Sequence, residues 1–178
     1  HPELTLNGDR ARYSIGLEQV KTAFRCAYSL LDKVAYFIND YWELGIPEKR
    51  VSFRTIWFDE KKKPQDKSRL RNEFQGMENL PLRGLFWLAK DIYEKELKDV
   101  AAPDAKELDE FRNHLEHKYV KVVDDFAISS TSSEHFFFCS DQLAHLVSES
   151  DLFGKAERLL KLSRSALIYL SLAMHVKE

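Results

Sequence analysis

Apolar residues recur at a helical period near the start of the chain. A spacing of three or four residues places side chains on one face of an α-helix. The stretch ends where Gly45 and Pro47 follow, because both residue types interrupt helices. We therefore predict a long helix before Gly45. Its apolar face is formed by Leu17, Val20, Phe24, Ala27, Leu31, Val34 and Ile38.

The same period predicts further helices later in the chain. Asn79 and Pro81 are typical of a helix start, and the apolar pattern then continues to about residue 100. Pro103 interrupts it. Asp104 and Glu107 then resemble a capping box, which would begin a helix with an apolar stripe from Leu108 through Tyr119 to Val122. We expect two last helices near residues 141–148 and 151–176.

The segments between these stretches lack a helical period. Residues 51–58 favour a short extended piece, residues 59–67 an exposed loop, and residues 69–74 a short helix. Residues 124–139 are rich in serine and then in phenylalanine, which favours irregular or short extended structure. We predict an all-α fold, an up-and-down bundle of four to five long helices with short irregular insertions. One domain, residues 13–178, follows a flexible lead-in, residues 1–12.

Composition narrows the class of protein. The chain has 178 residues, 44% of them hydrophobic and 31% charged, which suits one domain with a charged surface. No apolar run predicts a membrane span, and no secretion signal is visible. The net charge of −2 restricts any contact with nucleic acid to a local basic patch. Because the chain begins with His1, we expect it to be a fragment of a longer protein.

The two cysteines carry no recognisable chemistry. Cys26 and Cys139 are too few for a disulfide framework and lack the spacing of a zinc site. Cys26 lies in an apolar helical pattern and is predicted to be a small core residue. This usage fits a reducing cytoplasm.

One helical segment carries residues suited to phosphate chemistry, in the order Arg112, Asn113 and, four residues later, His117. Arginine binds phosphate through a planar set of donors, histidine exchanges protons near neutral pH, and asparagine orients an oxygen without adding charge. These are the groups that metal-free cleavage of an RNA phosphodiester requires. On an ideal helix, however, Arg112 and His117 point about 140° apart. Either a local distortion or a second copy of the helix must therefore bring them to one phosphate.

This Arg-Asn-x-x-x-His pattern within a helical bundle resembles the HEPN superfamily (higher eukaryotes and prokaryotes nucleotide-binding domains). The strings L-R-G-L-F-W-L-A-K-D-I at residues 82–92 and L-D-K-V-A-Y-F at residues 31–37 resemble a prokaryotic branch of it. The resemblance implies a homodimer through the face of the motif helix. It also implies a metal-independent endoribonuclease without cofactor, acting as a toxin or defence effector with an antitoxin or regulatory domain as partner.

The resemblance also implies roles for individual residues. His117 would transfer a proton, Arg112 would stabilise charge on the phosphate, and Asn113 would position either of them. A second histidine, His114, lies inside the motif and leaves open which imidazole transfers the proton. Lys118 and Lys121 are candidates for contacts with flanking phosphates, so His114, Lys118 and Lys121 complete the expected RNA-binding set.

Several alternatives remain open. Arg112 would also suit a surface ion pair with Asp109 or Glu116. Glu110, His114 and His117 form a poor metal site, and we predict no bound metal. Arg83, Trp87, Lys90 and Asp91 share a helix face, which we interpret as a row of ion pairs with Trp87 at a helix interface. The other interpretation is a surface on which Trp87 stacks a base. For the whole chain, the alternative function is a non-catalytic module that binds RNA or nucleotide or dimerises.

Overall fold

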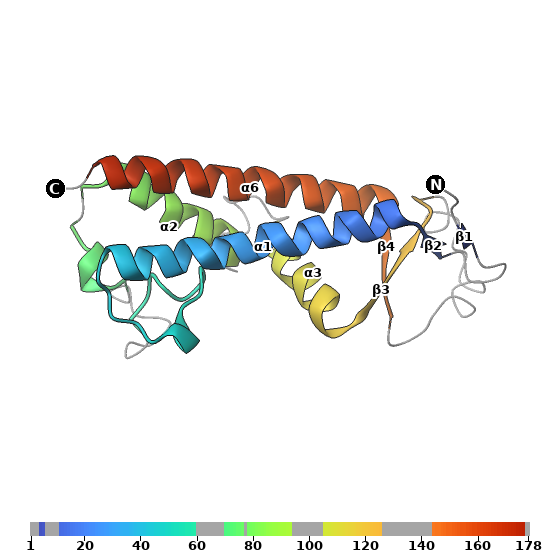
Figure 1. Ribbon diagram of the computed structural model, residues 1–178, viewed down its shortest axis with the longest axis horizontal. Coiled ribbons are helices and arrows are strands. Elements are labelled where there is room, and N and C mark those ends of the chain that lie inside the picture. The colour runs from blue at the N-terminus through green and yellow to red at the C-terminus, as the bar shows by residue number, and fades with distance from the viewer. Residues whose placement is uncertain are drawn as a thin grey trace. The chain divides into compact units, whose positions relative to one another are not determined.

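The computed structural model describes residues 4–5, 11–59, 70–76, 78–93, 105–125 and 144–176. Contacts divide the chain into two compact units. The first comprises His1–Ala27 and Glu107–Leu160, and the second comprises Tyr28–Lys106 and Lys161–Glu178. Two long helices, α1 (Ile15–Tyr41) and α6 (Glu149–His175), each contribute their first part to the first unit and their remainder to the second (Figure 1).

The first unit combines helices with two small sheets. Strands β1 (Leu4–Thr5) and β2 (Arg12–Tyr13) pair antiparallel. Helix α3 (Ala105–His117) leads directly into β3 (Tyr119–Val123), which pairs in parallel with β4 (Ala144–Ser148). The parallel register places Val120 opposite His145. Strand β4 then runs straight into α6, so the small parallel sheet joins the ends of two helices.

The core of the first unit lies between α1, α3, the parallel sheet and α6. The rings of Phe24 and Phe111 meet edge to face, with centroids 5.1 Å apart, and both are at most 2% exposed. Edge-to-face contact of this kind stabilises aromatic pairs beyond their burial alone. The other buried hydrophobic residues are Ala11, Leu17, Ala27, Leu108, Leu115, Val120, Val122, Val123, Val147, Leu152, Ala156 and Leu159.

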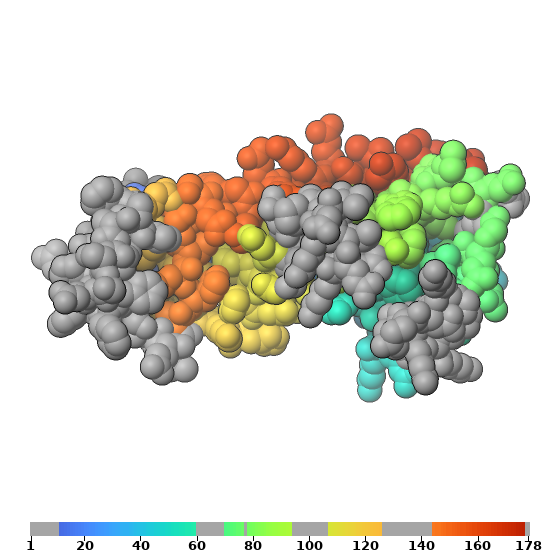
Figure 2. Space-filling view, turned by 180° about the vertical axis from the view of Figure 1, so that it is seen from behind, coloured from blue at the N-terminus to red at the C-terminus, as the bar shows by residue number. Residues whose placement is uncertain are grey.

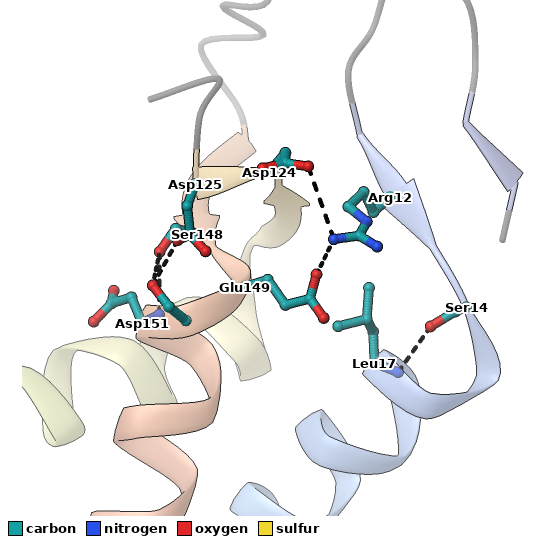
Figure 3. A network of polar contacts seen from close by, with 9 residues as sticks. Arg12, Ser14, Leu17, Asp124, Asp125, Ser148, Glu149 and Asp151 are labelled. Atoms are coloured by element: carbon teal, nitrogen blue, oxygen red, sulfur yellow. Dashed lines mark hydrogen bonds and ion pairs between the residues drawn. The ribbon is translucent and has the colours of Figure 1, made fainter. Parts of the chain in front are cut away.

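Polar contacts fix the start of α6 (Figure 3). Arg12 forms ion pairs with Glu149 and Asp124. The Ser148 hydroxyl accepts a hydrogen bond from the backbone N–H of Asp151 at 3.1 Å, which satisfies an otherwise unpaired amide of the first turn. Hydrogen bonds from Ser150 and Ser148 lower the pKa of Asp125. Ser14 caps α1 in the same way, through the amide of Leu17.

The second unit packs α2 (Leu80–Tyr93) with the remainders of α1 and α6 and with two short 3₁₀ helices, η1 (Glu48–Arg50) and η3 (Asn72–Phe74). Asn79 caps α2, since its Oδ1 accepts the amide of Leu82 at 2.9 Å while its Nδ2 donates to the carbonyl of Ala173. The buried indole of Trp57 donates to the carbonyl of Phe53. Beyond the end of α1, the Asn39 Nδ2 donates to the carbonyl of Ile46, and the Asn39 Oδ1 accepts a hydrogen bond from the Ile46 amide.

Much of the predicted architecture is confirmed. The fold is mainly α-helical, and α1, α2, α3 and α6 lie where the periodicity placed helices. Of the short helix expected over residues 69–74, Asn72–Phe74 forms the 3₁₀ helix η3. The predicted end of the α2 helix and the capping residue Asp104 lie outside the described residues, as do residues 60–69 and 126–143. Of the lead-in expected over residues 1–12, Leu4–Thr5 belongs to β1 and Arg12 to β2.

Four predictions about secondary structure and the core are wrong. Tyr119 and Val122 do not continue the α3 stripe, because Tyr119–Val123 is a strand. The helix expected at 141–148 is strand β4 over its described part. Residues 53–57 form turns rather than an extended piece. Cys26 is exposed rather than buried in the core, because α1 turns it away from the face that carries Phe24. Strands β3 and β4 form their hydrogen bonds with each other. Helical periodicity does not detect such a long-range pairing.

Candidate active site

The side chains of helix α3 point in three directions. Leu108, Phe111 and Leu115 face the core of the first unit. Asn113 and His117 are exposed, as expected for side chains four residues apart on the opposite face. Arg112 and His114 are partly exposed and lie on the two flanks between these faces. The motif helix therefore has an exposed ridge formed by Asn113 and His117, with Arg112 on one side of it and His114 on the other.

Arg112 and Asn113 are in contact. The Arg112 Nη1 donates to the Asn113 Oδ1 at 3.3 Å. Helix α3 continues without interruption from Ala105 to His117. The local distortion considered above as a way to bring Arg112 toward His117 is therefore absent from α3, and their directions differ by about 140° as on an ideal helix.

Arg25 of α1 fixes the last turn of the motif helix. Its Nη2 donates to the carbonyl of Leu115 at 2.6 Å, and its Nε lies 3.6 Å from the Glu116 Oε1. A cation beside the unpaired carbonyls at a helix C-terminus is electrostatically favourable. Glu116, one of the two carboxylates considered as partners of Arg112, thus lies in an ion pair with Arg25. Sequence reasoning missed Arg25, since nothing near it in the chain connects it to α3.

A second histidine joins the site from β4. The rings of His114 and His145 stack with centroids 4.0 Å apart and planes at 6° to each other. The ring of Phe111 lies 6.2 Å from that of His145. The Nδ1 atom of His114 is buried and has no hydrogen-bond partner in the described part of the chain. The sequence showed no partner for His145, because the contact arises only from the parallel pairing of β3 and β4.

The surroundings of His145 disfavour its protonated form. Burial lowers the pKa of His145 below its ordinary value, and the positive charges of His114, Lys155 and Lys118 lower it further, against a smaller opposite effect of Asp151. Two imidazoles at this separation repel each other when both are charged. His145 is therefore neutral near pH 7, when its ring holds that of His114 in place.

The lysines near the motif differ in their settings. Lys118 is exposed immediately after α3, and Lys121 is partly exposed on β3. Lys155 of α6 pairs with Asp151 and with Glu107, the latter at 3.0 Å. Burial lowers the pKa of Lys155, but its hydrogen bonds to Asp151 and Glu107 outweigh burial and raise it. Lys118 thus directly follows the motif helix and Lys121 lies on β3, whereas Lys155 neutralises two carboxylates.

The described residues contain no group of three His, Cys, Asp or Glu side chains that is arranged to hold a metal ion. Nor does any helix among them combine the length and the hydrophobicity needed to cross a bilayer.

The face of α2 with Arg83 and Trp87 is not a helix interface. Trp87 is 54% exposed, so the prediction that it packs between helices is wrong. The Lys90 Nζ instead lies 5.2 Å from the centre of its ring. Trp87 and Lys90 therefore lie next to each other on an exposed face of α2 in the second unit.

A mainly helical fold that carries arginine, asparagine and histidine on one exposed helix defines a HEPN-type domain, a class of nucleotide-binding or ribonuclease-type modules. The family comparison agrees with the motif. Residues 3–177 match the LA2681-like HEPN family, and the chain belongs to that family. Neither the curated proteins nor the solved structures yielded a match.

Proposed function

We propose that this protein is a metal-independent endoribonuclease. The single observation that carries the proposal is the exposed ridge of α3, where Asn113 and His117 face solvent and Arg112 is in contact with Asn113, in a chain of the HEPN class. Arginine and histidine are the groups that phosphodiester cleavage without a metal needs. A role as a toxin or defence effector in the cytoplasm, controlled by an antitoxin or regulatory domain, belongs to the same proposal and rests on the family alone.

The proposed reaction is an internal transfer. His117 takes the proton of an RNA 2′-hydroxyl, whose oxygen attacks the adjacent phosphorus. The bond to the 5′-oxygen of the next nucleotide breaks, and this oxygen takes a proton from water. The products are a 2′,3′-cyclic phosphate and a 5′-hydroxyl end. Arg112, held by Asn113, stabilises the charge that builds on the phosphate oxygens. His114, Lys118 and Lys121 contact the flanking RNA.

The geometry of α3 favours a shared site. Because α3 is uninterrupted, Arg112 and His117 of one helix diverge by about 140°. In a homodimer formed through the exposed face of α3, the Arg112 of one protomer faces the same cleft as the His117 of its partner. Two motifs then line one cleft, which resolves the divergence without bending either helix.

An RNA cleavage assay in excess EDTA tests the proposal. We expect the parent protein to cut single-stranded RNA and to leave cyclic phosphate ends, which mass spectrometry identifies. Arg112→Ala and His117→Ala should each lower the rate at least about a hundredfold, because the first removes charge stabilisation and the second removes general acid–base catalysis. His175→Ala, at the far end of α6, is the matched control and should cut like the parent. Cleavage that needs added metal, or that survives both substitutions, contradicts the proposal.

Mixing the two inactive variants tests whether the cleft is shared. A heterodimer of Arg112→Ala and His117→Ala keeps one intact arginine and one intact histidine on different protomers. If the site draws one group from each protomer, mixing restores part of the activity. If mixing restores none although the subunits exchange, each site uses both groups of one chain. RNA binding without cleavage in the parent protein would instead support the non-catalytic module.

A further inference from the structure

A hollow of about 390 Å³ opens beside α2 in the second unit. Its walls are mainly apolar, formed by Trp57, Phe74, Leu82 and Phe86, and its rim carries Arg83 and Trp87. The green surface of α2 lies on the face of this unit that Figure 2 shows. The volume falls within the range of about 300–1,000 Å³ that is typical of small-molecule sites. It is large enough for a planar ring system.

The aromatic side chains of this hollow differ sharply in exposure. Trp57 is 1% exposed and Phe74 is 8% exposed, which makes them fixed walls, whereas Trp87 at the rim is 54% exposed. An indole that leaves half its surface in water, next to an apolar hollow, offers a free face for stacking. The side chain of Arg83, one helical turn earlier, has no ion pair or hydrogen bond within the described part of the chain.

A second, smaller hollow of about 160 Å³ shares the wall formed by Phe86. It is lined by Arg54, Thr55 and Lys90 together with Phe58 and Tyr93. Arg54 lies 5.7 Å from the centre of the Tyr93 ring, and Lys90 lies 5.4 Å from that of Phe86. Among the residues that the structure describes, no carboxylate lines either hollow. An apolar hollow suited to a flat ring therefore adjoins a cationic hollow suited to an anion.

We propose that these two hollows form one binding site for a nucleotide unit. The base lies in the larger hollow and stacks on Trp87, while the phosphate lies in the smaller one between Arg54 and Lys90, with Arg83 at the rim. Aromatic stacking combined with cationic contacts to phosphate is how proteins commonly hold unpaired nucleotides. The site lies in the second unit and does not depend on cleavage at α3.

Two sources supply this chemistry, a free nucleotide and a nucleotide within single-stranded RNA. Isothermal titration calorimetry with AMP, adenosine and a hexamer of adenylate tests both. We expect AMP to bind more tightly than adenosine, and 0.5 M salt to weaken AMP but not adenosine, because salt screens the phosphate contacts. If the hexamer binds more tightly than AMP and displaces it, the occupant is a nucleotide of an RNA chain. If AMP binds more tightly, the occupant is a free nucleotide.

Variants locate the site. Trp87→Ala should weaken AMP binding about ten- to a hundredfold through loss of stacking, while Trp87→Phe should retain most of it. Arg54→Gln and Lys90→Gln should each weaken AMP by about three- to tenfold and leave adenosine unchanged. Lys33→Gln and Arg164→Gln remove exposed charges that line neither hollow, so they serve as charge-matched controls. Trp87 is exposed, and far-ultraviolet circular dichroism confirms that each variant is folded.

The results of these binding experiments can be distinguished from the results of the cleavage assays that test the proposed function. In the Arg112→Ala, His117→Ala double variant, AMP should bind as in the parent even though cleavage is lost. The proposal is overturned if neither AMP nor the hexamer binds, or if Trp87→Ala and Arg54→Gln bind both as the parent does. It is also overturned if binding disappears with the α3 double variant, which would place the nucleotide on the motif helix.

Discussion

The stacked rings of His114 and His145 bring two titratable groups together at the edge of the motif. Their centroids are 4.0 Å apart, and positive charges of Lys118 and Lys155 surround His145. His114 stacks on the partly buried ring of His145 and therefore has less rotational freedom than the exposed His117. This difference favours His117 for proton transfer and His114 for positioning, within the proposed ribonuclease reaction.

His145 should make the protein less stable in mild acid. Its pKa is lowered in the folded state, chiefly by burial, from an ordinary value of 6.5. The unfolded chain therefore takes up a proton at a higher pH than the folded chain does. The resulting stability is present above pH 6.5 and is lost as the pH falls through the lowered pKa. Urea unfolding at pH 7.5 and pH 5 measures this loss.

Substitution identifies the contribution of this residue. His145→Gln should reduce the difference between the two pH values, because glutamine has no proton to gain. His175→Gln, at the exposed end of α6, should leave the difference unchanged. Equal pH dependence in parent and His145→Gln would show that His145 ionises alike in the folded and unfolded chains.

At the scale of elements, the anchoring of α3 depends on one side chain of α1. Arg25→Ala removes a charged hydrogen bond to the Leu115 carbonyl and the ion pair with Glu116. Because Arg25 is 42% exposed, solvent screens these contacts, and we expect a loss of about 1 kcal/mol in the free energy of unfolding. Hydrogen exchange of the last-turn amides of α3 should accelerate.

A matched variant separates the effect of the charge at this position from that of the planar set of donors. Arg25→Lys keeps the charge but loses the planar set of donors, and we expect an intermediate effect. Unchanged exchange at α3 in Arg25→Ala would mean that the core residues Phe111 and Leu115 fix the helix without this anchor.

Helix α2 approaches α6 closely at Gly84. A methyl group there would meet the ring of Tyr169 at 3.0–3.1 Å, tighter than normal contact. Alanine favours a helix interior over glycine by about 1 kcal/mol, yet we expect Gly84→Ala to destabilise by a similar amount because the ring must move. In a Tyr169→Ala background the same change should stabilise. Thermal unfolding of the four proteins measures the coupling, and additive effects would contradict it.

The sequence predicted the helices better than the strands, for a physical reason. A helix face is a local pattern, so Leu17 to Ile38 sufficed for α1, and Asn79 with Pro81 marked the start of α2. In Tyr119–Val123, the side chains of Val120 and Val122 alternate toward the core as in a strand, but the stretch also extends the stripe of Phe111 and Leu115. Only the pairing with β4 decides between a strand and a continued helix.

The candidate site likewise contains features that the local sequence predicted and features that it did not. Helical geometry alone placed Asn113 and His117 on an exposed face and Phe111 and Leu115 on a buried one. Arg25 and His145 reach α3 from α1 and from β4, and their contacts depend on how distant segments fold together. No spacing within the motif carries that information.

At the scale of the whole molecule, the proposed shared cleft requires two copies. We expect sedimentation velocity at micromolar concentration to report a dimer, since Arg112 and His117 of one α3 diverge by about 140°. Asn113→Lys places two like charges at the proposed interface and should shift the equilibrium toward the monomer, whereas Lys33→Glu on α1 should not. A strictly monomeric protein that cuts RNA would contradict the shared cleft.

The indoles of this chain are unevenly distributed. All three tryptophans, Trp42, Trp57 and Trp87, lie within Tyr28–Lys106 and hence in the second unit. Light emitted by tryptophan therefore reports on the second unit alone, while the helical circular dichroism signal comes from both. Recording both signals along one denaturation curve reveals whether the unit that carries the α3 motif melts together with the unit that carries Trp57, without any label attached to the protein.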